Sequence, residues 1–133
     1  MKQEILAAVE QYKKAVHTGK AEDFYPIWAK NCETALISIS RVFRGNDSIY
    51  NDFIVGCIHT AYSRIDLVST EIDVRPLSDT TAAVIFRYYT DCDRAETGEH
   101  YSIKGVETQV YVLEEGAWKL AHVQYGKDSE ILS

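Results

Sequence analysis

The sequence is poor in the residues that cross-link a fold or anchor it in a membrane. Three cysteines occur in 133 residues, and Cys32, Cys57 and Cys92 show no CxxC spacing. This odd, unpatterned set argues against a disulfide framework and against a zinc site. No stretch offers the ~20 apolar residues that a membrane span needs, and the charged N-terminal segment lacks the apolar core of a signal peptide. We therefore expect a cytoplasmic protein that contacts no membrane and needs no metal or cofactor.

Positive charge is also scarce. The chain has 14 Lys and Arg against 20 Asp and Glu, so its net charge is −6. Nothing in the sequence forms a basic stripe that could neutralise phosphates, which argues against a nucleic-acid partner. The common nucleotide, phosphate, zinc-protease and calcium motifs are missing as well. A small molecule or another protein is the partner class that remains.

The chain does have the composition of a globular domain, with 46% apolar residues. No linker, repeat or low-complexity segment divides it, so a single domain over residues 1–133 is expected. Apolar residues at helical spacing predict helices over 2–18 and 21–29, and a third helix capped by Asn46 or Asp47. A strand over 34–43 is expected before that third helix. Helices first and strands afterwards indicate the α+β class.

From Tyr62 onward the apolar pattern has a period of two, which predicts long antiparallel strands. Their expected ranges are 64–77, 80–93, 101–113 and 117–125. A three-residue loop at 114–116 would put Gln109 opposite Ala121, whereas a two-residue turn would put it beside His122. On the first register, Glu107, Gln109 and Tyr125 share one face of the sheet. The other face then carries Val110, Val112, Trp118 and Leu120.

Three strings carry a resemblance to a known family. They are Gly105-Val-Glu-Thr-Gln-Val-Tyr, Glu115-Gly-Ala-Trp118-Lys-Leu-Ala-His122-Val-Gln-Tyr125 and Phe43-Arg-Gly-Asn-Asp-Ser-Ile. They resemble the nuclear transport factor 2-like superfamily, within it the SnoaL-like group and the association domain of calcium/calmodulin-dependent protein kinase II. The resemblance implies a cone-shaped, cystatin-like fold in which a strongly curved sheet wraps the helices and leaves a pocket. This superfamily hosts isomerases, cyclases and dehydratases as well as proteins without assigned activity.

The resemblance also suggests pocket residues. In the kinase association domain, the positions matching Tyr89, Gln109 and Tyr125 carry basic residues that line an anion-attracting pocket, but here all three are uncharged. Arg87, two residues before Tyr89, is expected on the same face and could pair with Glu107. A neutral or zwitterionic ligand is therefore expected. The Arg87–Glu107 pair could equally be a structural ion pair, and the tyrosines could serve packing alone.

Three functions stay open at this stage. A binding module would use the six candidate pocket residues without chemistry. An enzyme would use Glu107 as general base next to a carbonyl, with Tyr89 or Tyr125 donating to the oxyanion. An oligomerisation hub would need neither. The candidate ligand-binding residues are Trp28, Arg87, Tyr89, Glu107, Gln109 and Tyr125, of which Trp28 could instead belong to the core. The apolar face formed by Val110, Val112, Trp118 and Leu120 predicts a homodimer.

Overall fold

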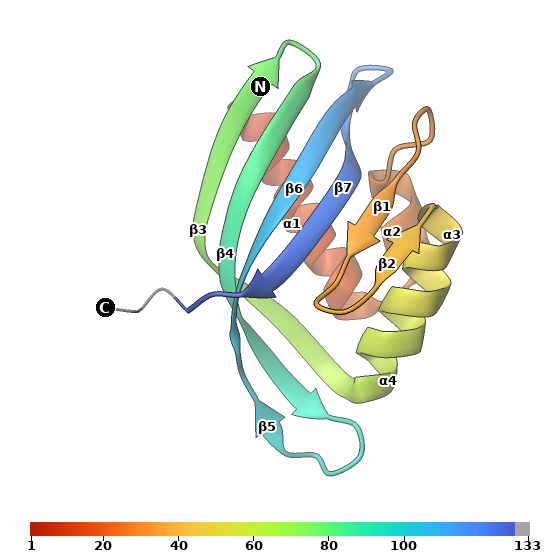
Figure 1. The fold of residues 1–133 in the computed structure, drawn as a ribbon, viewed down its shortest axis with the longest axis vertical. Helices are drawn as coiled ribbons and strands as arrows, with labels where there is room; N and C mark the ends of the chain where they lie inside the picture. Colours follow the sequence, from red (N-terminus) through yellow and green to blue (C-terminus); the bar gives the residue numbers. More distant parts are fainter. Residues whose placement is uncertain (130–133) are drawn as a thin grey trace.

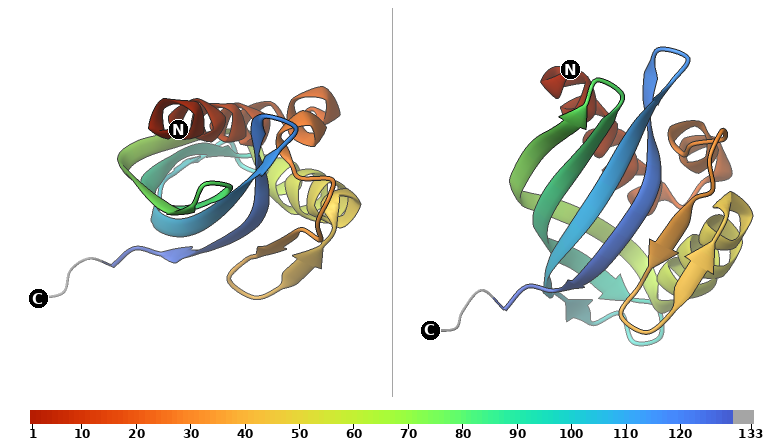
Figure 2. Two further views of the ribbon diagram at one scale, coloured as in Figure 1. Left: turned by 90° about the horizontal axis from the view of Figure 1, so that it is seen from above. Right: turned by 45° about the horizontal axis from the view of Figure 1, so that its top comes forward.

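The computed structural model describes residues 1–129 as helices packed on one side of a curled sheet (Figures 1 and 2). The long helix α1, Lys2–Thr18, lies against the concave face of that sheet and matches its predicted range. It ends at Gly19, whose φ of 66° is a left-handed conformation that glycine adopts without steric cost. The buried side chains of α1 form one stripe that faces the core: Ile5, Val9, Tyr12, Ala15 and Val16.

The remaining helices are short or irregular. The predicted helix 21–29 is an α-helix, α2 (Ala21–Phe24), followed by a 3₁₀ turn, η1 (Tyr25–Ile27), and Trp28 is already extended. The third helix consists of α3 (Asn46–Ser48), the π-helical η2 (Ile49–Ile58) and α4 (His59–Ala61). Gly45 occupies its N-cap with a φ of 83°, so capping by Asn46 or Asp47 was a wrong prediction. The Asn46 side chain instead donates to the Ala29 carbonyl at 2.9 Å.

The strands within residues 1–129 are β1 (Ala35–Ile37), β2 (Val42–Arg44), β3 (Tyr62–Ser78), β4 (Thr81–Arg94), β5 (His100–Tyr101), β6 (Lys104–Glu114) and β7 (Ala117–Lys127). These seven strands form one mixed sheet in the order β2-β1-β7-β6-β4-β3, with β5 added to β4. Among their pairings, only β1 with β7 is parallel. The predicted strand 34–43 is a hairpin, because the chain turns where Ser38 N–H donates to the Arg41 carbonyl at 2.8 Å. The α+β class is thereby confirmed.

A β-bulge in β7 decides which side chains face the core. The turn between β6 and β7 has two residues, Glu115 and Gly116, both with positive φ. Tyr111 pairs with Leu120 but Val110 pairs with His122, so Ala121 is an extra residue. Beyond the bulge Gln109 pairs with Val123, and both pairings considered from the sequence were wrong.

Because of the bulge, the predicted faces are correct beyond Ala121 but reversed between Ala121 and the turn. Glu107 pairs with Tyr125, so these side chains share the inner face as predicted. On the turn side, Leu120 is 0% exposed and Trp118 packs against the core. The predicted outward position of Trp118 and Leu120 is therefore wrong, because the extra residue reverses the alternation within β7.

No helix within residues 1–129 has the length and hydrophobicity to cross a membrane.

Candidate functional site

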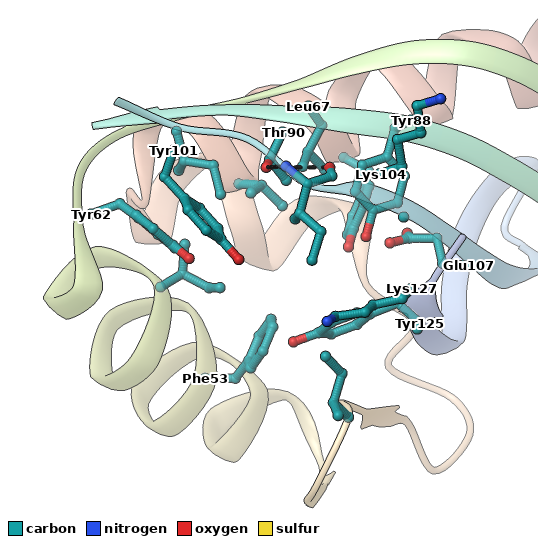
Figure 3. A pocket seen from close by; sticks show the side chains of 18 residues that line it. Phe53, Tyr62, Leu67, Tyr88, Thr90, Tyr101, Lys104, Glu107, Tyr125 and Lys127 are labelled. Atoms are coloured by element: carbon teal, nitrogen blue, oxygen red, sulfur yellow. Dashed lines mark hydrogen bonds between the residues drawn. The ribbon is translucent and has the colours of Figure 1, made fainter. Parts of the chain in front are cut away.

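A cavity of about 180 Å³ opens between α1, η2 and the curved part of the sheet (Figure 3). Its walls are mainly aromatic and aliphatic side chains from α1, η2, β3, β4, β6 and β7. Four lining residues carry charged or hydroxyl-bearing aliphatic side chains: Thr90, Lys104, Glu107 and Lys127. The principal apolar and aromatic lining residues are Tyr12, Val16, Phe53, Ile58, Tyr62, Ile65, Leu67, Tyr88, Tyr101, Ile103 and Tyr125. Such an apolar pocket with few polar groups is typical of small-molecule sites.

Glu107 is the acidic group of this pocket, and it is only 3% exposed. A chain of hydrogen bonds holds it from behind. The Tyr111 hydroxyl donates to Gln109 Oε1 at 2.7 Å, and Gln109 Nε2 donates to Glu107 Oε2 at 2.8 Å. These bonds orient the Gln109 amide and fix the carboxyl group, because each buried polar atom along the chain finds a partner.

The hydroxyl groups of Tyr12 and Tyr88 also hydrogen-bond the Glu107 carboxyl group from the side of α1 and β4. Burial raises the pKa of Glu107 to about 7, while the hydrogen bonds from Gln109, Tyr12 and Tyr88 act in the opposite direction. Burial likewise raises the pKa of Tyr12 and of Tyr88, with a further contribution from the neighbouring Glu107. Near neutral pH the carboxyl group can therefore take up or release a proton, while both phenols remain protonated donors.

Gly105 makes this arrangement possible. A Cβ at position 105 would lie 2.4 Å from Cζ of Tyr88, which is closer than any real contact allows. Because Gly105 pairs with Tyr88 across β4 and β6, its missing side chain leaves room for the Tyr88 ring to lie over the β6 backbone. The ring thereby brings its hydroxyl toward Glu107, two residues further along β6 (Figure 3).

The structure brings together only part of the predicted site. Glu107 and Tyr125 both line the cavity. Gln109 is 0% exposed and lies behind Glu107, so it positions the carboxyl group rather than facing the cavity. Trp28 is 1% exposed and stacks on Phe24 with ring centroids 5.5 Å apart. Of the two alternatives left open for Trp28, the structure therefore supports the core position.

The predicted positions of Arg87 and Tyr89 are wrong. Phe86 pairs with Glu107 and Tyr88 with Gly105, so the even-numbered side chains of β4 face inward. Arg87 points outward, where its Nε donates to Asp128 Oδ2 at 2.8 Å, and Tyr89 is 40% exposed. An ion pair between Arg87 and Glu107 is not formed, because the sheet separates the two side chains.

Among the pocket residues that sequence reasoning missed, Tyr12, Tyr88 and Lys127 carry polar groups that matter for the site. Tyr12 belongs to the apolar stripe of α1 and could not be told from a core residue. Tyr88 could be placed in the pocket only once the pairing of β4 with β6 was known. Lys127 could have been found, because it follows Tyr125 by two residues on the same strand and so shares its face.

Within residues 1–129, no cluster of three or more His, Cys, Asp or Glu side chains could hold a metal ion.

Comparison with known proteins bears on the fold of the chain. The sequence model of a family described as the SnoaL-like domain matches residues 1–124. No functionally curated protein matches the chain. Among solved structures, a nuclear transport factor 2-like superfamily protein from Salmonella enterica serovar Typhimurium superposes with a TM-score of 0.90 at 20% identity. The alignment covers 98% of this chain and 93% of the other.

Two further structures illustrate the range of proteins that share the fold. Hexachlorocyclohexane dehydrochlorinase LinA-type3 from Novosphingobium barchaimii has a TM-score of 0.83 at 13% identity, covering 96% of this chain and 86% of its own. A candidate calcium/calmodulin dependent protein kinase II association domain from Xanthomonas campestris has a TM-score of 0.80 at 20% identity, covering 98% and 90%. Other matches have a cystatin-like fold. The predicted fold is thereby confirmed, although identities this low carry no activity across.

Proposed function

Since this chain belongs to the SnoaL-like domain family, we propose that it binds a small organic molecule in the Glu107 pocket and moves a proton of that molecule. The observation that carries the proposal is Glu107 itself. Its carboxyl group is buried, has a pKa raised to about 7 by that burial, and faces an apolar cavity. A base with a pKa near the working pH is the most effective at proton transfer.

The proposed reaction begins at a carbon atom next to a carbonyl group. The Glu107 carboxylate takes a proton from this carbon, and the electron pair of the C–H bond moves onto the carbonyl oxygen as an enolate. The Tyr125 hydroxyl lines the same cavity and can donate to that oxygen, because burial raises its pKa to about 12 and keeps it protonated. Protonated Glu107 then returns the proton to another carbon, which isomerises the substrate. In an elimination, the enolate electron pair instead forms a carbon–carbon double bond while a β-substituent departs with its bonding electrons, and Glu107 gives its proton to the departing group or to solvent.

Deuterium exchange tests this proposal without knowledge of the physiological substrate. A panel of small cyclic and aryl ketones in D₂O is incubated with the protein, and loss of the α-proton signal is followed by NMR. The exchange rate should exceed the buffer rate for at least one ketone. It should rise as pH increases through about 7, since the active form of a base is the deprotonated one. If ketones of the panel bind but none of them exchanges faster than in buffer at any pH, the proposal is contradicted.

A binding module without chemistry is the second candidate function. It is favoured by the hydrogen bonds that Gln109, Tyr12 and Tyr88 already make to Glu107, because a carboxyl group so well satisfied can serve as a fixed polar contact. In that case ligands would bind and stabilise the protein, but exchange would stay at the buffer rate. The same experiment therefore separates the two functions.

We also retain the homodimer as a proposal, now on different residues. With Trp118 and Leu120 facing inward, the outer face of β4 and β6 still carries Val110, Val112 and Tyr89. Ile85 and Val106 extend this apolar face. Sedimentation of the wild type should give a dimer and Val110→Glu a folded monomer, because the substitution puts a charge into a desolvated contact. A wild-type monomer would contradict both this proposal and the hub alternative.

A further inference from the structure

One charged group in the cavity has no part in the proton transfer. Lys127 pairs with Gly105 at the end of β7 and so shares the inner face with Glu107 and Tyr125. Its ammonium group points into the cavity beside the Tyr125 ring (Figure 3). Lys127 forms no ion pair with any residue of the range 1–129. A cation in this position is available to a bound molecule.

The other charges of the cavity do not offset Lys127. The hydrogen-bond partners of Glu107 are Gln109, Tyr12 and Tyr88, and Lys127 is not one of them. Lys104, the second lysine of the lining, directs its ammonium group away from the cavity centre (Figure 3). Figure 3 shows Lys127 and Glu107 on the same side of the cavity, where the paired strands β7 and β6 lie, while Phe53 and Tyr101 form part of the apolar and aromatic wall on the opposite side. The cavity therefore has a cation and a proton acceptor on one side and an apolar, aromatic wall on the other.

We propose that the substrate carries a carboxylate that binds Lys127 and an apolar segment of about one ring that packs against the aromatic wall and lies beside Glu107. This inference rests on the proposed function only for the part that lies beside Glu107. The size follows from the cavity, because about 180 Å³ is close to the ~150 Å³ of an engineered apolar cavity that holds benzene. An anionic substrate differs from the neutral or zwitterionic ligand that the sequence led us to expect. The ammonium group of a zwitterionic α-amino acid would lie next to its carboxylate and would meet Lys127 with like charge.

Three probes that share one skeleton but differ in charge test the charge requirement: phenylacetate, its uncharged methyl ester, and zwitterionic phenylglycine. Their dissociation constants are measured by calorimetry or NMR titration for the wild type, Lys127→Gln and Lys2→Gln. Lys2 begins α1 on the surface and gives a control with the same loss of charge. The wild type should bind phenylacetate most tightly of the three. Lys127→Gln should weaken phenylacetate about tenfold and leave the ester unchanged, because one charge-assisted contact is lost. Lys2→Gln should bind like the wild type.

Several results would overturn the inference. The first is that the wild type and Lys127→Gln bind phenylacetate with the same dissociation constant, and the second is that Lys2→Gln weakens phenylacetate as much as Lys127→Gln does. The others are that the wild type binds the ester or phenylglycine more tightly than phenylacetate, or that it binds none of the three probes. The outcome is distinct from a failure of the proposed function. Glu107-dependent exchange on uncharged ketones without any Lys127 effect would leave the proton transfer intact and refute the carboxylate. Lys127-dependent binding without exchange on any ketone would support the carboxylate and refute the proton transfer.

Discussion

Replacing Glu107 by glutamine is expected to abolish proton transfer while the pocket still binds ligand. The amide keeps the size of the carboxyl group and can still accept the hydrogen bond from Gln109 Nε2. Its NH₂ group can donate to the hydroxyl of Tyr12 or Tyr88, so the buried polar atoms stay satisfied. It cannot take up a proton from carbon, and a lost general base lowers turnover by about 10²- to 10⁴-fold. Exchange rates and ligand dissociation constants of the same preparation are the two measurements.

The stability of Glu107→Gln provides a control on the assigned pKa. A carboxyl group whose folded pKa is raised from 4.5 to about 7 binds its proton more tightly in the folded than in the unfolded state. Its contribution to the free energy of unfolding is complete below about pH 4.5 and is lost as pH rises through about 7. The wild type should therefore lose on the order of 3 kcal/mol more than Glu107→Gln between pH 5 and pH 8. Denaturant unfolding at the two pH values measures the difference.

Two results would contradict the role given to Glu107. Exchange at the wild-type rate in Glu107→Gln would show that another group takes the proton. The same loss of stability with pH in both proteins would show that Glu107 has an ordinary pKa in the folded state. A variant that binds ligand as tightly as the wild type but no longer exchanges its proton supports the base rather than the binding module.

The parts of the fold that could be predicted are those set by local periodicity. The stripe of apolar residues in α1 fixes both its length and its buried side, and the period of two reveals each long strand. The shared face of Glu107 and Tyr125 could be predicted because both lie beyond the bulge, on the side away from the turn, where the predicted pairing puts the right side chains on each face. The break at Ser38 was not visible, since β-branched and aromatic residues continue on both sides of it.

The parts that could not be predicted depend on how one strand is aligned with the next. In β4 both sets of alternate residues hold aromatic side chains, with Phe86 and Tyr88 in one and Tyr89 in the other. Composition therefore does not say which set faces the core, and Arg87 was placed in the pocket although it lies outside. Only the long-range pairing of β4 with β6 decides which set faces the core.

Leu120→Glu is expected to unfold the protein, and this result tests the bulge at Ala121 directly. Leu120 is 0% exposed, pairs with Tyr111 and forms a bridge with Trp28. A glutamate there would bury a carboxylate without a partner, at a cost of at least about 4 kcal/mol, which is a large part of the stability of a domain. Gln124→Glu adds the same charge at an exposed position of the same strand and should change stability by less than about 0.5 kcal/mol. Circular dichroism and urea unfolding compare the two. Without the bulge Leu120 would face outward, so a stably folded Leu120→Glu monomer would refute the register of β6 and β7.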